Sequence, residues 1–277
     1  MFEQKAAVPA TVWPERLAQI DLVAPPRESY SLAVPPSAAY RLAKRGLDSV
    51  VSFSVLVLAS PVLLLVALLI RVTSPGPVIY RQRRVGKGGR IFTMYKFRSM
   101  YQNADHTLHQ KAYSLYVRGS GGYGKVDRET LAELASPAPQ AMHVDATPRQ
   151  PWSRLLTRLQ AAVMPEDPRI TPIGQLIRRT SLDEFPQLFN VLIGDMSLVG
   201  PRPPIPYEVR LYTQKHLGRL TVTPGVTGMW QIHGRGRVPF DRMVEMDLHY
   251  IAHRSFWLDL RLLLLTIPSV LFSRGAK

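Results

Sequence analysis

Residues 50–70 read VVSFSVLVLASPVLLLVALLI, a run of 21 residues without a charged side chain. Such a run is long enough to form a membrane helix. The flanks on both sides are basic: Arg41, Lys44, Arg45, Arg71, Arg81, Arg83, Arg84 and Lys87. Positive charge usually stays on the cytoplasmic side of a membrane, so both ends of the run are expected there.

Ser60-Pro61 lies at the midpoint of this run. Each half has about 10 residues, or ~15 Å of helix, and reaches only the middle of a ~30 Å hydrocarbon core. A helix that enters the membrane, breaks at Ser60-Pro61 and returns to the same face fits both observations, with the Ser60 hydroxyl bonding a carbonyl freed by Pro61. The alternative is a single span with a proline kink.

A second informative stretch is residues 180–190, TSLDEFPQLFN, in which Asp183 and Glu184 are adjacent. Ser181 and Glu184 have the spacing of a capping box, and Pro186 restricts where the helix can begin. A carboxylate in the first helical turn is favoured in its ionised form, and free N–H groups there suit a phosphate. The simpler interpretation is that the two acids only cap a helix.

Basic residues surround this acidic pair in the sequence. Arg178 precedes it, and Arg202 follows in the proline-rich stretch 200–204. Lys96 and Arg98 belong to a predicted β-hairpin spanning 78–100, where they face either a ligand or lipid headgroup, or solvent. An ionised carboxylate beside arginines that bind phosphate indicates chemistry on a phosphate.

The glycine-rich stretch 223–235 carries a tryptophan and an arginine. It is a candidate wall of a pocket for a base or a sugar, and the alternative is a turn with a buried tryptophan. The pocket residues proposed from the sequence are Pro224, Gly225, Thr227, Gly228, Gln231 and Arg235.

The whole chain has 277 residues, a net charge of +15 and a pI of about 10.4. This charge predicts an anionic partner, and the absence of cysteine excludes disulfides and thiolate chemistry. A nucleic-acid partner is not expected, because the basic residues are spread along the chain and the uncharged stretch is long. A non-enzymatic basic scaffold that binds anionic lipid is the alternative to an enzyme.

The predicted fold is α+β and mainly helical, in a monotopic membrane protein. Residues 1–40 are expected to form a poorly ordered arm, 41–277 the functional domain, 41–75 the membrane hairpin and 101–166 a variable insertion. A basic amphipathic helix at the membrane surface is expected at 152–164, and an interfacial or core helix is expected at 256–272.

Several motifs, in this order along the chain, resemble one known family, the bacterial sugar transferases or monotopic polyprenyl-phosphate phosphoglycosyl transferases. These motifs are KRGLD at 44–48, Ser60-Pro61, YKFRSM at 95–100, DPRIT at 167–171, RRTSLDE at 178–184, GDMSLVGPRP at 194–203 and PGVTG at 224–228. The likeness runs from about residue 44 to the C-terminus, and the chain resembles the short form of the family.

This resemblance implies a UDP-sugar donor, an undecaprenyl phosphate acceptor and Mg²⁺ at the cytoplasmic face of a bacterial inner membrane. It implies that Asp183 and Glu184 form the catalytic dyad, with Asp183 as nucleophile and both as candidate Mg²⁺ ligands. Arg178, Arg202, Lys96 and Arg98 are then expected on substrate phosphates, and Lys44, Arg45, Ser60 and Pro61 in the membrane anchor. The expected product is a lipid-diphosphate-sugar that begins glycan assembly; the particular sugar and a homo-oligomeric state stay open.

Overall fold

The computed structural model describes residues 37–102, 113–114, 116–117, 169–233 and 238–272. Most of the expected arm and of the expected insertion lies outside these ranges. So do the expected helix at 152–164 and the pocket candidate Arg235.

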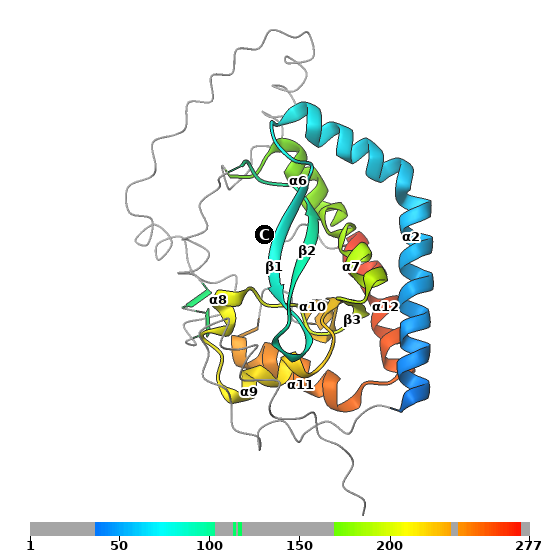
Figure 1. The fold of residues 1–277 in the computed structure, drawn as a ribbon, viewed down its shortest axis with the longest axis vertical. Coiled ribbons are helices and arrows are strands. Elements are labelled where there is room, and N and C mark those ends of the chain that lie inside the picture. The colour runs from blue at the N-terminus through cyan, green and yellow to red at the C-terminus, as the bar shows by residue number, and fades with distance from the viewer. Residues whose placement is uncertain (1–36, 103–112, 115, 118–168, 234–237, 273–277) are drawn as a thin grey trace, which may run out of the picture.

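The described elements are mainly helical, with two small sheets (Figure 1). They are α2 (Ala38–Thr73), β1 (Ile79–Val85), η2 (Lys87–Gly89), β2 (Ile91–Phe97), α6 (Pro172–Arg179), η3 (Leu182–Glu184), α7 (Gln187–Ile193), β3 (Ser197–Val199), α8 (Pro206–Val209), α9 (Gln214–Leu217), η4 (Gly218–Thr221), β4 (Gly225–Thr227), α10 (Met229–His233), α11 (Phe240–His253) and α12 (Phe256–Phe272). This composition confirms the mainly helical α+β class.

Helix α2 is continuous for 36 residues and contains Pro61. Because Pro61 has no N–H, the carbonyl of Val57 loses its usual helical partner. The Ser60 hydroxyl donates to that carbonyl at 2.7 Å, as the sequence predicted. Figure 1 shows that α2 changes direction along its length, so the proline bends the helix rather than interrupting it.

One face of α2 packs against the rest of the protein, and the side chains on its other faces are exposed. Val66 and Ile70 form one buried hydrophobic cluster with Phe97 and Ile177. Val51, nearer the start of α2, packs against a separate hydrophobic cluster. The exposed apolar side chains of α2 are Leu42, Val50, Phe53, Val57, Leu58, Val62, Leu64, Leu65, Leu68 and Val72. Within the described residues, α2 is the one helix long and apolar enough to cross a membrane.

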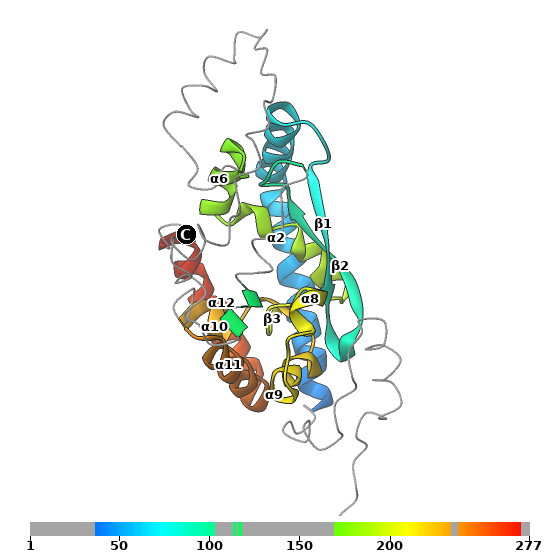
Figure 2. The same ribbon diagram turned by 90° about the vertical axis from the view of Figure 1, so that its left-hand side faces the viewer.

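The predicted β-hairpin is confirmed. Strands β1 and β2 pair antiparallel from Ile79–Phe97 to Val85–Ile91, around the glycine-rich turn. Figure 2 shows the hairpin along one side of the molecule, with α10, α11 and α12 on the other. The hairpin therefore forms a wall against which the following segments pack.

The second sheet brings two glycine-containing segments together. Strands β3 and β4 pair in parallel, and a Cβ added to Gly225 would lie 2.1 Å from the backbone nitrogen of Gly200. Such a contact is impossible for any larger residue, so glycine is required here for the close approach of the two backbones.

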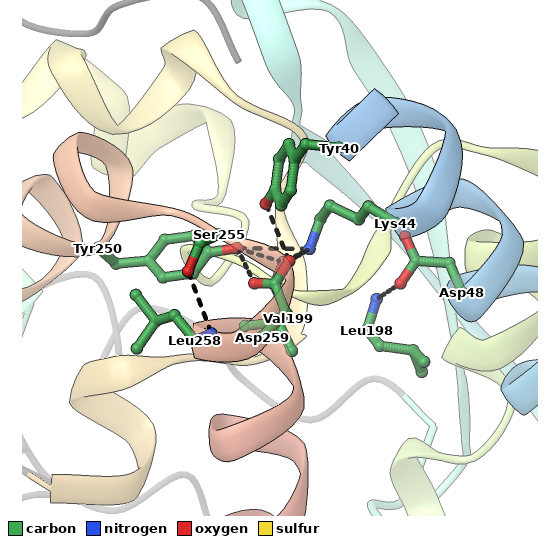
Figure 3. Close-up of polar contacts among 9 residues, drawn as sticks. All are labelled: Tyr40, Lys44, Asp48, Leu198, Val199, Tyr250, Ser255, Leu258 and Asp259. Carbon is green, nitrogen blue, oxygen red and sulfur yellow. Dashed lines mark hydrogen bonds and ion pairs between the residues drawn. The ribbon is translucent and has the colours of Figure 1, made fainter. Parts of the chain in front are cut away.

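A buried polar cluster joins the start of α2 to α12 and β3 (Figure 3). Asp259, which is 1% exposed, accepts hydrogen bonds from Lys44 at 2.8 Å, from Tyr40 at 2.8 Å and from Tyr250 at 2.7 Å. Lys44 also donates to the carbonyl of Val199 at 3.1 Å. The cluster therefore pairs each buried charge with an opposite charge or a hydrogen-bond partner.

This cluster corrects the expectation that Lys44 and Arg45 act as the basic membrane flank. Lys44 points into the protein, as Figure 3 shows. Arg45 donates to the carbonyls of Val191 and Leu192 at 2.6 and 2.5 Å, at the C-terminal end of α7, where a positive charge is favourable. Both side chains tie α2 to the neighbouring elements.

The Lys44→Met variant is expected to lower the thermal stability strongly, because Asp259 would lose its cation while staying buried. Breaking a buried pair in this way costs about 3–5 kcal/mol. The matched control is Lys215→Met, which removes the lysine of an exposed pair with Glu245. Thermal unfolding of both variants in the same detergent is the measurement, and equal melting temperatures would contradict the structural role of Lys44.

Candidate active site

The acidic pair lies in a tight turn rather than in a helix. Residues 182–184 form the 3-10 turn η3, and α7 begins only at Gln187. Ser181 before the turn has φ +56°, the one left-handed non-glycine residue among those described. This costly conformation redirects the chain sharply between α6 and η3.

The predicted capping box is therefore wrong. The Ser181 side chain makes no capping hydrogen bond, and the Glu184 side chain accepts a hydrogen bond from Lys96. The acids precede α7 and do not occupy its first turn, where the sequence analysis had placed them.

Lys96 of β2 joins the hairpin to the acidic turn. Its Nζ lies 2.8 Å from Oε1 of Glu184, with the lysine side chain 15% exposed and the glutamate side chain 32% exposed. Burial lowers the pKa of Lys96, and the charge of Glu184 opposes that shift. The Lys96 ammonium is thus already largely removed from water, so it loses little further hydration when a negative group binds beside it.

Two arginines complete a cationic surround. A guanidinium nitrogen of Arg202 lies 3.9 Å from Oε1 of Glu184, and its side chain is 41% exposed. Arg178, at the end of α6, is close enough to lower the pKa of Asp183. The structure thus gathers five of the residues proposed from the sequence: Asp183, Glu184, Lys96, Arg178 and Arg202.

Arg98 does not join this group. Its guanidinium is buried and donates to the carbonyls of Ser74 and Pro75 at 2.8 and 2.7 Å. It also donates to the Ser74 hydroxyl at 2.7 Å. Arg98 fixes the chain where it leaves α2, so the expectation that it binds a substrate phosphate does not agree with its position.

The predicted pocket wall at 224–231 supports the segment that carries Arg202. The carbonyl of Pro224 accepts from Ser197, and Gly225 donates to the carbonyl of Pro201 at 2.8 Å. The carbonyl of Thr227 accepts from Gly200 at 2.9 Å. Gly228 lies against Gly200, and Gln231 donates to Val226 at 3.0 Å.

Asn190 is a site residue that the sequence analysis missed. It is fully buried on α7, donates to the carbonyl of Thr93 at 2.7 Å and accepts from the backbone of Tyr95 at 3.1 Å. Its amide thus pairs with the edge of β2 as a neighbouring strand would. An amide between the apolar residues Leu188 and Val191 was the available signal, and its effect is to hold the acidic turn beside Lys96.

The ionisation of Asp183 differs from the expectation. Its pKa is raised to about 6, first by burial and then by the charge of Glu184, while Lys96 and Arg178 lower it. The carboxylate is mostly ionised at pH 7 but is less hydrated than an exposed aspartate. A partly desolvated carboxylate with cations beside it can act as a nucleophile toward an anionic centre.

The site as a whole holds two carboxylates and three cations, a formal charge of +1 when all are ionised. Cations around a nucleophile are the arrangement that phosphoryl transfer needs, because negative charge spreads over the phosphate oxygens. The fold and the site together define a protein with one long exposed apolar helix and a pair of carboxylates surrounded by cations, an arrangement chemically suited to a phosphate.

Comparison with known families agrees with this class. A family model described as bacterial sugar transferase matches residues 39–273. The chain belongs to the bacterial sugar transferase family.

Three similar proteins show the range of relatives. The undecaprenyl-phosphate galactose phosphotransferase of Salmonella typhimurium is 39% identical over 237 residues, 85% of this chain and 42% of that protein. The galactosyl transferase CpsE of Streptococcus agalactiae is 40% identical over 203 residues, 73% of this chain and 36% of that protein. The exopolysaccharide production protein ExoY of Sinorhizobium fredii is 34% identical over 235 residues, 85% of this chain and 88% of that protein. The chain thus spans less than half of the first two relatives and most of the third.

Proposed function

We propose that this protein transfers a sugar-1-phosphate from a UDP-sugar to undecaprenyl phosphate, with release of UMP. The observation that carries the proposal is the Asp183 carboxylate, which has Lys96 and Arg178 close enough to lower its pKa. The name of the Salmonella typhimurium relative, which includes undecaprenyl phosphate and galactose, supports the same classes of acceptor and sugar.

The proposed reaction has two displacements at one phosphorus atom. In the first, an oxygen of Asp183 attacks the sugar-bearing phosphorus, the bond to the bridging oxygen breaks, and UMP leaves with that oxygen. In the second, a phosphate oxygen of undecaprenyl phosphate attacks the same phosphorus, and the aspartyl–phosphorus bond breaks. Asp183 is regenerated, and the product is an undecaprenyl-diphosphate-sugar.

The cationic residues have separate roles in this scheme. Lys96 forms an ion pair with Glu184, and Arg202 lies near the same carboxylate but is more exposed. Arg202 is therefore the cation placed to meet the donor diphosphate. Hydrogen bonds from arginine to phosphate oxygens are charge-assisted and stabilise the spread negative charge of the transition state. Glu184 keeps the two cations in place beside Asp183.

Mg²⁺ fits the acidic pair in one particular mode. Among the described residues, no three acidic or histidine side chains gather into a protein-only metal site. Mg²⁺ is commonly held by one or two carboxylates together with substrate phosphates and water, which Asp183 and Glu184 would allow. When bound, the ion would neutralise charge on the diphosphate.

The exposed apolar residues of α2 support a membrane location, which we place at the cytoplasmic face of the inner membrane. Trp257 and Leu264 of α12 and Phe189 of α7 are also exposed and would lie at the lipid boundary. The bend at Pro61 fits both the re-entrant path, which we propose for α2, and the kinked single span, and a labelling experiment separates the two. Because the chain has no cysteine, Ala39→Cys and Arg81→Cys give unique labels, and labelling from opposite sides of sealed vesicles would exclude the re-entrant path.

The proposed activity is tested with purified protein, undecaprenyl phosphate and a panel of UDP-sugars. We expect UMP and a lipid-linked sugar from at least one donor, with UDP-galactose and UDP-glucose as the first to try. Release of UDP would mean that the sugar moves without its phosphate, and would overturn the proposal. So would the absence of UMP with every donor.

A further inference from the structure

The segment that carries Arg202 has an unusual shortage of backbone donors. Positions 201, 203 and 204 are prolines, so three of four consecutive residues have no N–H group. Apart from the Arg202 N–H, the backbone of this segment can take part in hydrogen bonds only through its carbonyls. Its conformation therefore depends on donors from elsewhere in the chain.

Each of the four carbonyls has such a donor. Pro201 accepts from the backbone of Gly225 at 2.8 Å, and Pro204 accepts from the backbone of Val85 at 2.9 Å. The two carbonyls between them, those of Arg202 and Pro203, accept from arginine side chains instead. These two carbonyls belong to the functional residue itself and to its neighbour.

Arg84 is the stronger of the two arginine donors. One of its guanidinium nitrogens donates to the carbonyl of Pro203 at 2.8 Å, while another donates to Gln82 at 2.6 Å. Arg84 is 5% exposed and lies on β1 beside Val85, whose backbone N–H donates to the carbonyl of Pro204. Arg84 therefore cannot receive a substrate from solvent, but it fixes the backbone one residue from Arg202.

Arg219 of η4 supports the same segment. It donates to the carbonyl of Arg202 at 3.4 Å, a long hydrogen bond, and is itself held by Asp247 at 2.7 Å and Tyr212 at 2.7 Å. Burial raises the pKa of Asp247 to about 6, while the guanidinium of Arg219 lowers it. This buried pair gives Arg219 a fixed position from which to reach the segment.

We infer that Arg84, assisted by Arg219, is a positioning residue that sets where the Arg202 guanidinium stands relative to Glu184 and the donor phosphate. The inference rests on the proposed function, since it assigns Arg202 to that phosphate. Lysine cannot replace Arg84 in this role, because one ammonium cannot reproduce the planar fork that reaches Gln82 and Pro203 together. A shift of about 1 Å in a positioned group can cost on the order of 100-fold in rate.

The test is a double-mutant cycle of Arg84→Lys with Arg202→Ala, read as kcat/KM for UMP release. Arg84→Lys alone is expected to lower kcat/KM by about 10- to 100-fold. In the Arg202→Ala background the same change is expected to have less than about a twofold effect, because the group that it positions is gone. Arg242→Lys, at an exposed arginine on α11, is the matched control and keeps the wild-type rate.

Independent losses that multiply in the double variant would overturn the inference, because they would show that Arg84 does not act through Arg202. If Arg84→Lys does not fold, Arg219→Lys is tested in the same cycle with the same criterion. Wild-type activity in Arg84→Lys, alongside an inactive Asp183→Asn, refutes this inference alone. Absence of UMP release by the unmodified protein refutes the proposed function instead.

Discussion

Asp183→Asn is expected to release no measurable UMP from the UDP-sugar that the unmodified protein uses. The amide is nearly the same size as the carboxylate but has no anionic oxygen to attack phosphorus. We expect a loss of at least about a thousandfold in kcat, since removal of a nucleophile is among the largest single effects in enzymes. The covalent intermediate should also disappear, which mass spectrometry of protein trapped with donor alone would measure.

Two further measurements make this result specific. Asp241→Asn, a change of the same kind at an exposed site on α11, is expected to keep full activity. Membrane association of Asp183→Asn should equal that of the unmodified protein, because α2 is untouched. If the variant released UMP at the native rate, Asp183 would not be the nucleophile, whereas a protein that only binds anionic lipid would release no UMP with or without the substitution.

Lys96→Met is expected to produce the second-largest loss, about 100-fold or more in kcat/KM at pH 7. The variant removes the cation at 2.8 Å from Glu184 and one of the two cations that lower the pKa of Asp183. The nucleophile must be ionised, so activity in the unmodified protein falls as the pH drops through about 6. Without Lys96 the pKa of Asp183 rises, and the acid limb of the profile should move to higher pH.

Glu184→Gln should move the same limb in the opposite direction. The charge of Glu184 raises the pKa of Asp183, so its removal lets Asp183 stay ionised at lower pH. The measurement is kcat/KM as a function of pH for the unmodified protein, Lys96→Met and Glu184→Gln. Lys87→Met, at the exposed hairpin turn, is the control for removal of a lysine. Limbs that coincide in all three would show that another group controls the acid side.

Local patterns predicted the parts of the fold that depend on neighbouring residues. The hairpin follows from two apolar strands around a glycine-rich turn, and α2 from its uncharged sequence and from Ser60 beside Pro61. The Ser60 hydroxyl and the carbonyl that it satisfies are only three residues apart. Such contacts are visible in a short window of sequence.

The errors arise where distant residues decide. Lys44 was assigned to a membrane flank because its partner Asp259 is 215 positions away. The capping box at Ser181 failed because Glu184 is drawn to Lys96, 88 positions earlier. Arg98 looked like a ligand-binding residue until its carbonyl partners in the segment after α2 were known. Charge and spacing indicated which residues are chemically suited to the site, and only the fold shows which of them meet.

Helix α2 carries both the exposed apolar residues and the side chains that hydrogen-bond to β3, the strand that precedes Arg202. Lys44 bonds the carbonyl of Val199, and Asp48 accepts from the backbone of Leu198 at 3.0 Å. If α2 enters the membrane as proposed, the number of residues from Asp48 to Pro61 sets the spacing between the bend in the lipid and β3, the strand that leads to Arg202. One added residue would rotate the helix by about 100° and lengthen it by about 1.5 Å, so under this proposal a single helix would fix the height of the carboxylate site above the bilayer.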